Sequence, residues 1–150
     1  MEQLKQSAQD IRQLAHNMLA QGVAAEQLTQ FISTLNDLLT QRLIELECQA
    51  QGISHSELCE LGVCWLALGS EGRFEQTLNT DQDNGIIFKV PEGKSADEMR
   101  NVLLPLAERI NAALDACGFP LCKGNIMASN PKWCLSLEEW KGTFSEWIHR

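Results

Sequence analysis

Residues 69–88 read GSEGRFEQTLNTDQDNGIIF, and this stretch decides which fold the chain can adopt. It lies between two apolar runs. The first run, residues 63–68, is bounded by glycines and predicts a strand that is buried on both faces. The second run, residues 85–90, predicts another strand that ends at a Pro-Glu-Gly turn. Two strands joined by a glycine turn and a polar loop therefore form the centre of the expected fold.

The turn after the first strand carries residue types that bind phosphate. Gly69 lets the backbone turn sharply and lets a ligand approach closely. Residues 71–76 have helical propensity, so the N–H groups at the start of this helix are expected to form an anion site. Ser70 adds a hydroxyl donor, and Arg73 adds a permanent cation that can grip phosphate with two hydrogen bonds.

Asp81 and Asp83 precede the second strand and are two residues apart. Alternate residues of an extended chain share a face, so both carboxylates are expected at the mouth of this strand, where they suit Mg²⁺. Taken alone, the segment is also typical of a polar turn. An EF-hand loop is disfavoured because its glycine and glutamate are missing from the required positions, and a Walker A loop because no Gly-Lys-Ser/Thr follows Gly69.

Composition and charge limit the function classes. The chain has 150 residues, of which 44% are hydrophobic, and a net charge of −8, which argues against binding to duplex nucleic acid. No apolar run is long enough to cross a membrane and no signal peptide is recognisable, so the expected location is the cytoplasm. The six cysteines form no CxxC pair, so we expect reduced, buried thiols.

Helices are expected on both sides of this centre. Residues 1–52 read as helix with a break at Gly22, and an apolar stripe over residues 28–46 serves either packing or a homodimer. A short helix is expected over residues 54–61. A longer helix begins at the capping box of Ser95 and Glu98 and runs to about residue 116. Its inward face is predicted to comprise Met99, Val102, Leu103, Leu106, Ile110 and Leu114.

The remaining segments complete a mixed α/β (α+β) arrangement. Residues 119–122 predict a third strand, and residues 136–150 predict a helix that carries Trp140 and Trp147. Together with Trp133, these tryptophans form either a packed face or a platform on which bases stack. We divide the chain into an N-terminal helical segment, 1–54, and a core, 55–150. The apolar pattern at the end of the chain has no stop signal, so we expect a C-terminal helical domain to follow.

The motif of Gly69-Ser70 followed by Asp81 and Asp83 resembles the signature of the DNA polymerase β-like nucleotidyltransferases. The longer string over residues 67–84 is similar to a bacterial nucleotidyltransferase family that is often fused to CBS domains. That family resembles in turn the uridylyltransferase of the PII protein and the adenylyltransferase of glutamine synthetase. The resemblance extends over nearly the whole chain and is strongest over residues 62–134.

The resemblance implies a polymerase β-like core and a role for each matching residue. Gly69 and Ser70 would hold nucleotide phosphates, and Asp81 and Asp83 would bind Mg²⁺ or Mn²⁺. Arg73 would either contact the phosphates or brace the turn by pairing with Glu75. The superfamily usually supplies a third carboxylate from a later strand, and residues 119–122 contain none.

Two functions follow from the resemblance. The first is metal-dependent transfer of a nucleoside monophosphate from an NTP, such as ATP, to an acceptor hydroxyl, with release of pyrophosphate. The acceptor is either a regulatory protein or a small molecule, and CBS or other regulatory domains are expected as partners in a longer chain. The second is an inactive nucleotide-sensing or adaptor module, which the missing third carboxylate favours.

Overall fold

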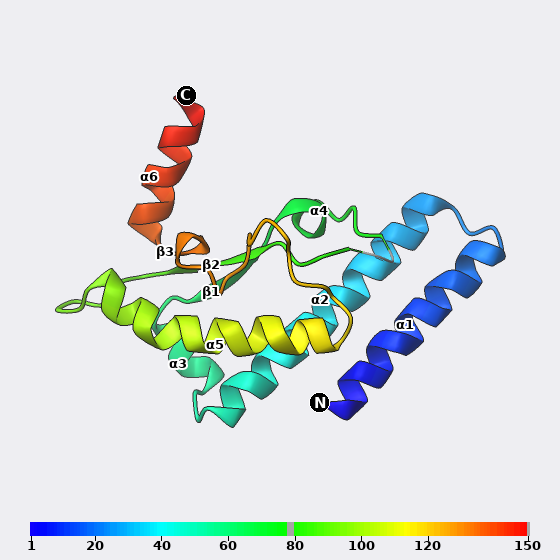
Figure 1. Cartoon of the computed structure of the whole chain (residues 1–150), viewed down its shortest axis with the longest axis horizontal. Coiled ribbons are helices and arrows are strands. Elements are labelled where there is room, and N and C mark those ends of the chain that lie inside the picture. The colour runs from blue at the N-terminus through cyan, green and yellow to red at the C-terminus, as the bar shows by residue number, and fades with distance from the viewer. Residues whose placement is uncertain (78–79, 150) are drawn as a thin grey trace.

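The computed structural model describes residues 1–77 and 80–149 (Figure 1). Leu78 and Asn79 of the predicted polar loop, and Arg150 of the predicted last helix, lie outside the described residues. In chain order the elements are α1 (Glu2–Ala20), α2 (Ala25–Ala50), α3 (His55–Glu60), β1 (Cys64–Ala67), α4 (Gly69–Gly72), β2 (Asn84–Phe88), α5 (Ala96–Ala116), the 3-10 helix η1 (Pro131–Trp133), β3 (Cys134–Ser136) and α6 (Leu137–Ile148). The expected mixture of helices and a small sheet is confirmed.

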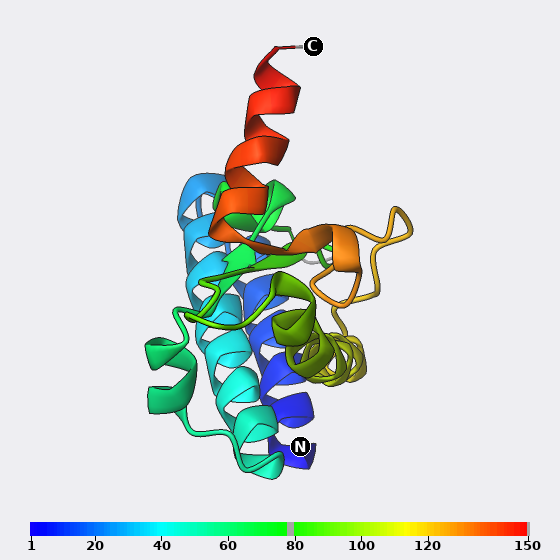
Figure 2. The ribbon, with the colours of Figure 1, turned by 90° about the vertical axis from the view of Figure 1, so that its left-hand side faces the viewer.

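The first two helices form a hairpin in which α1 and α2 lie side by side (Figure 2). The chain turns between them at Gly22, which has φ +79°, as the predicted break required. Ala15 of α1 packs there against Leu28 and Ile32 of α2. Further along α2, Leu43 is fully buried in the main core. The division of the chain at residue 54 stays a prediction.

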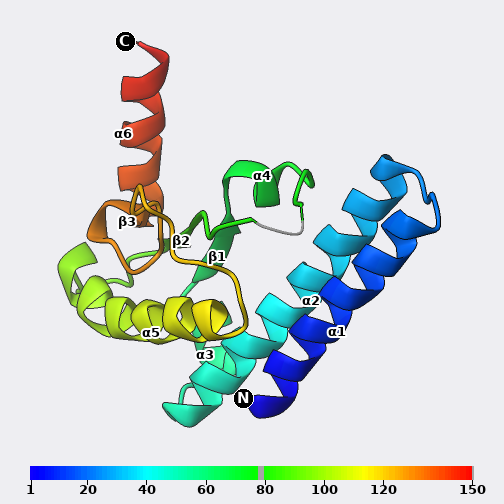
Figure 3. The same ribbon diagram turned by 45° about the vertical axis from the view of Figure 1, so that its right-hand side comes forward.

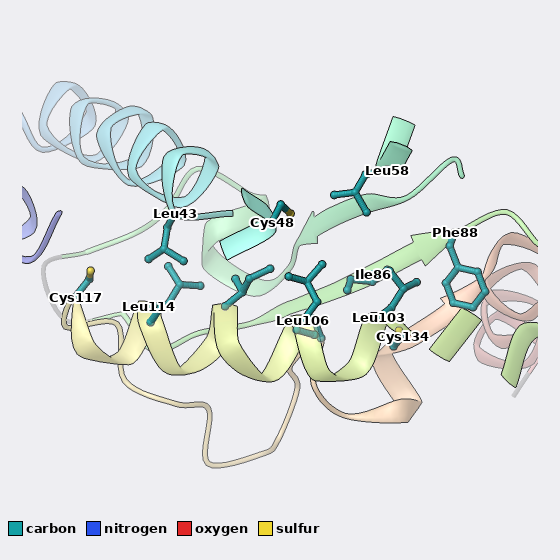
Figure 4. Packing of buried hydrophobic residues seen from close by; sticks show 14 of the residues in the cluster. Leu43, Cys48, Leu58, Ile86, Phe88, Leu103, Leu106, Leu114, Cys117 and Cys134 are labelled. Carbon is teal, nitrogen blue, oxygen red and sulfur yellow. The ribbon is translucent and has the colours of Figure 1, made fainter. Parts of the chain in front are cut away.

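The main core lies between the sheet and the helices α2 and α5 (Figures 3 and 4). Side chains from several elements meet in it, including Leu43 of α2, Phe88 of β2 and Leu106 of α5. The capping box of Ser95 and Glu98 starts α5 as predicted. One predicted inward residue is wrong: Val102 is 57% exposed. A helix turns about 100° per residue, and this places Val102 at the edge of the packed arc formed by Leu103, Leu106 and Ile110, where its side chain reaches solvent.

The sheet has the order β1-β2-β3, with β1 and β2 antiparallel and β2 and β3 parallel. The prediction that the first strand is buried on both faces is wrong. Cys64 and Ala67 at the ends of β1 are exposed, because β1 is an edge strand and only β2 lies between two neighbours. β2 has four of its five residues buried.

Two further predictions of local structure are wrong. The third strand is not residues 119–122, which adopt no strand; Cys134–Ser136 pairs with β2 instead. Pro120 has no N–H to contribute to a ladder. The helix after β1 is not residues 71–76 but the single turn α4, which begins at Gly69. Phe74, with φ +56°, interrupts the helical conformation. A four-residue helix has too few aligned peptides for the predicted helix-start anion site.

The last helix extends away from the rest of the molecule (Figures 1 and 2). Its capping box of Ser136 and Glu139 starts it next to β3. Trp140 is 3% exposed, and its Nε1–H donates to the carbonyl of Ile86 at 3.0 Å. Glu139 also pairs with Arg100 of α5 at 2.8 Å. The first turn of α6 is therefore fixed to both the sheet and α5.

All six cysteines lie in the described part of the chain, and none is joined in a disulfide. Three of them, Cys48, Cys117 and Cys134, are buried as expected, whereas Cys59 and Cys64 are exposed because they lie on α3 and on the edge strand. Among the described residues, none of the helices is both long and apolar enough to span a bilayer.

Candidate functional site

The turn after β1 brings Gly69 directly against Asp83. Gly69 has φ +55°, a left-handed conformation that favours glycine, and a Cβ at this position would overlap with Asp83 Oδ2. The backbone joins the same two segments, because the N–H of Leu68 donates to the carbonyl of Asp83 at 2.9 Å. Ser70 is half-buried next to Gly69. Three of the predicted site residues therefore lie together at one end of the sheet.

The segment from Asp81 to Asn84 alternates between side chains that face solvent and side chains that are buried. Asp81 is exposed and Asp83 is half-buried, whereas Gln82 and Asn84 are 3% and 1% exposed. This is the alternation of an extended chain, and it turns both carboxylates away from the core. Within the described residues, neither carboxylate accepts a hydrogen bond or pairs with a cation. Their roles in binding stay predictions.

Three buried amide side chains hold this segment in place. Gln82 Nε2 donates to the carbonyls of Asn111 and Phe119 at 2.9 and 2.8 Å. Asn111 Nδ2 donates in turn to Gln82 Oε1 at 2.8 Å and to Asn84 Oδ1 at 3.0 Å. Asn84 Oδ1 also accepts from the N–H of Ala128 at 2.8 Å. The network ties the carboxylate segment to α5 and to the loop before η1.

Sequence reasoning did not identify this network. A signal for it exists, because Gln82 and Asn84 occupy the positions that alternate with the two aspartates. Asn111 is the one polar residue among the buried side chains of α5. A polar residue on a buried helical face requires a hydrogen-bonding partner, which identifies it as a candidate for such a network.

Glu71 is an acidic neighbour of the site that the sequence did not single out. Burial raises the pKa of this carboxyl, and the charges of Asp37 and Asp83 raise it further, to about 7. Glu71 also lines a small hollow together with Asp81. The site thus gathers several carboxyl groups, and no described cation pairs with Asp81 or Asp83. A positively charged ligand would reduce the repulsion among these carboxylates.

Arg73 follows the same turn, but its guanidinium pairs with Glu75 rather than with either aspartate. Its Nε donates to Glu75 Oε2 at 2.8 Å, and both side chains are more than half exposed. The pairing that would brace the turn, one of the two possibilities left open by the sequence, is therefore present. Contact between Arg73 and phosphate stays a prediction.

A third carboxylate is not supplied by the strand next to β2. The observed third strand, Cys134–Ser136, contains no acidic residue, as was also true of the segment predicted in its place. Among the side chains that the structure describes, no three His, Cys, Asp or Glu residues are grouped so that they could hold a metal ion by themselves. Any cation at Asp81 and Asp83 would need further ligands from its substrate or from water.

A cleft of about 300 Å³ opens next to Gly69 and Asp83. Its other wall is aromatic. Trp133 lies 6.0 Å from Trp140 and 6.2 Å from Trp147, measured between ring centroids. The sequence left open whether these tryptophans form a packed face or a platform on which bases stack. Trp140 is buried, as a packed face requires, whereas Trp147 is 49% exposed and lines the cleft.

A larger cavity lies elsewhere, between α2, α3, β1 and α5. It measures about 550 Å³ and is mostly apolar, and none of the predicted site residues lines it. The candidate site is therefore defined by its polar groups and its aromatic cleft rather than by cavity size.

Replacing Gly69 with alanine is expected to destabilise the protein by about 1–2 kcal/mol more than the same change at Gly22. Both glycines have positive φ, so both variants carry backbone strain. Only at Gly69 does the new methyl group also displace a neighbour, since nothing lies within 4 Å of a Cβ at Gly22. Urea denaturation of both variants measures the difference. Equal losses would contradict the close packing of Gly69 and Asp83.

The Glu71→Gln variant is expected to be more stable than the wild type at pH 8, by about 2 kcal/mol in metal-free protein. Between pH 4.5 and about 7 the folded protein binds more protons at Glu71 than the unfolded chain does. Wild-type stability therefore falls as the pH rises through this window, and glutamine removes the effect.

Urea denaturation in EDTA at pH 5 and pH 8 compares the two proteins. Glu146→Gln, the same change at an exposed position of α6, serves as the control and is expected to alter stability at pH 8 by less than about 0.5 kcal/mol. A gain from Glu71→Gln that is the same at pH 5 and pH 8 would contradict the raised pKa.

Comparison with known proteins adds one finding. A family model described as "Putative nucleotidyltransferase DUF294" matches residues 9–150. Neither the search of curated proteins nor the search of solved structures found a match. The matched region includes every element from the middle of α1 to the end of α6 and contains the whole candidate site.

Proposed function

Because the chain belongs to this nucleotidyltransferase family, we propose that it transfers a nucleoside monophosphate from an NTP to an acceptor hydroxyl and releases pyrophosphate. The observation that carries the proposal is the contact between the Gly69 turn and the Asp83 carboxylate. A polymerase β-like core is part of the same proposal, and it rests on the family. Phosphates held at the turn would lie next to a cation held at Asp81 and Asp83.

The residues present fit a divalent metal. Asp81 and Asp83 are two hard oxygen ligands without a described partner, and Glu71 adds a third carboxyl group nearby, whose pKa of about 7 leaves it partly protonated at neutral pH in metal-free protein. Mg²⁺ commonly uses one or two carboxylates and completes its shell with water and phosphate oxygens, so the absence of a third protein ligand from β3 is compatible with it. When bound, Mg²⁺ or Mn²⁺ supplies charge neutralisation for the leaving pyrophosphate and activation of the acceptor hydroxyl.

The chain's own residues bind and orient the substrate. Because Gly69 has no side chain, Asp83 can lie directly against the turn, so phosphates at the turn would meet a cation held by Asp83. The Ser70 hydroxyl can donate to a phosphate oxygen. Gln82, Asn84 and Asn111 fix the backbone that carries the two aspartates, so the carboxylates need little reorganisation when the substrate binds. Arg73 braces the turn through Glu75 and reaches phosphate only when that exposed pair opens.

The partners proposed from the sequence remain part of this proposal. They are an NTP, an acceptor that carries a hydroxyl group, and regulatory domains such as CBS in a longer chain. A homodimer through the N-terminal helices would have to form through the exposed side chains of α2. Most of the apolar stripe is not available for it, because Leu28, Ile32, Leu39 and Leu43 are buried within the chain itself. Leu38, 56% exposed, is the most exposed apolar residue of that stripe.

The direct test is calorimetric titration of each NTP with and without Mg²⁺, followed by an assay for pyrophosphate release with candidate acceptors. We expect binding that requires Mg²⁺, and pyrophosphate release once the acceptor is supplied. Binding that is unaffected by Mg²⁺ would contradict the metal-dependent mechanism.

The second candidate function is a nucleotide-sensing module with the same fold. It is favoured by one observation, the absence of an acidic residue from β3 next to the two aspartates. The same experiments separate the two functions, since a sensor binds nucleotide without releasing pyrophosphate under any acceptor condition.

A further inference from the structure

The aromatic wall of the cleft next to Gly69 and Asp83 has no function in the fold that accounts for its exposure. Trp147 and Phe144 are 49% and 53% exposed although both are large aromatic side chains. Their rings are 5.1 Å apart and meet edge to face. Trp133 from η1 packs against Trp147, with ring centroids 6.2 Å apart. Exposed aromatic rings that line a concave surface are typical of a binding site.

The helix that carries this aromatic wall, α6, is anchored at its first turn. Trp140, one turn before Phe144 on α6, is buried and donates its Nε1–H to the carbonyl of Ile86 in β2. Arg100 of α5 pairs with Glu139 at the start of the same helix. The exposed rings are thus presented by a helix whose first turn is anchored to the sheet, so a ligand would meet a preformed surface.

The opposite wall of the cleft is part of the candidate site itself. Leu68, Gly69 and Asp83 line it, and Asp83 is the one charged residue among the cleft-lining residues. A ligand in the cleft would therefore lie against apolar and aromatic side chains at one end and reach the Gly69 turn at the other. A cleft of about 300 Å³ is at the lower end of the range for small-molecule sites, which is roughly 300–1,000 Å³.

We propose that the cleft between α6 and the Gly69 turn binds the nucleobase of the NTP, with the ring stacked on Trp147 and Phe144. The proposal rests on the proposed function, since it places the base next to the phosphates and metal assigned there. Stacking uses the flat face that every base has, and the cleft offers few polar groups to read a base edge. We therefore infer weak discrimination among bases, with purines bound more tightly than pyrimidines because they offer more area.

The test compares ATP with inorganic tripolyphosphate, both in Mg²⁺, by calorimetric titration of the intact chain. Trp147→Leu removes the aromatic face and keeps apolar bulk, whereas Trp147→Phe restores a ring. Trp147→Leu is expected to weaken ATP binding by about tenfold and to leave tripolyphosphate binding unchanged. Trp147→Phe is expected to recover most of the loss. The matched control, Ile148→Ala, truncates an exposed apolar side chain on the same helix that does not line the cleft.

Several outcomes would overturn the proposal. Equal weakening of ATP and tripolyphosphate by Trp147→Leu would show a general effect on the phosphate site. ATP that binds wild type no more tightly than tripolyphosphate would show that the base contributes nothing, while the proposed function stands. If Trp147→Leu alters the oligomeric state in sedimentation but not the ATP affinity, the cleft is occupied by a second copy of the chain. If wild type binds neither ligand, the proposed function fails first and the base site fails with it.

Discussion

Replacement of Asp81 and Asp83 together by asparagine is expected to reduce nucleotidyl transfer at least 100-fold without loosening the fold. Asparagine has nearly the same shape but lacks the negative charge that would hold Mg²⁺. The fold should not suffer, because neither carboxylate makes a hydrogen bond or ion pair within the described residues. Stability should even rise, since Asp83 is one of the charges that repel Glu71.

We therefore expect transfer activity to fall while stability rises. Pyrophosphate release measures the activity, and thermal unfolding measures the stability. The matched control is Glu108→Gln with Asp115→Asn, which removes two exposed negative charges from α5 and is expected to leave transfer unchanged. Full activity in the Asp81→Asn/Asp83→Asn protein would exclude both residues as metal ligands. Lost activity that is accompanied by a lower melting temperature would point to a structural role instead.

Replacement of Asn111 by alanine is expected to lower the free energy of unfolding by about 4 kcal/mol. Asn111 is 2% exposed, and its amide donates to Gln82 and Asn84 while its Oδ1 accepts from the N–H of Ser129. Its removal leaves buried polar groups without partners and opens a cavity among them. The segment that carries the two aspartates would lose its fixed position as well.

Asn101→Ala on the same helix provides the control, because Asn101 is exposed and helix propensity alone decides its effect. Urea denaturation of both variants measures the two effects. We expect the Asn101 change to be neutral or slightly stabilising. A loss below about 1 kcal/mol for Asn111→Ala would mean that the amide network contributes little to the fold.

Local signals in the sequence were sufficient for most of the helices. Gly22 ended the first helix of the hairpin, and the capping box of Ser95 and Glu98 placed the start of α5. Such signals act within a few residues along the chain, so they need no knowledge of the fold. The alternation across Asp81 and Asp83 is of the same kind, because side chains in any extended segment alternate.

Predictions that depend on which segments are neighbours in space, such as the burial and the pairing of strands, were wrong. Residues 63–68 have the composition of a buried strand, yet β1 is at the edge of the sheet and its ends are exposed. Residues 119–122 were expected to form the third strand, whereas Cys134–Ser136 pairs with β2. Whether an apolar segment becomes a central strand depends on which other segment competes for the same edge, and only the assembled sheet decides that.

The same distinction between local and spatial information applies to the candidate site. The sequence by itself determined the residue types of the site, the glycine turn, the two aspartates and the family to which they belong. Only the tertiary structure decided that Asp83 packs against Gly69, that Asn111 fixes the carboxylate segment, and that Trp147 faces the cleft while Trp140 is buried. These contacts join residues far apart in the chain, and their energies depend on distance, burial and charge in three dimensions, which local sequence patterns do not encode.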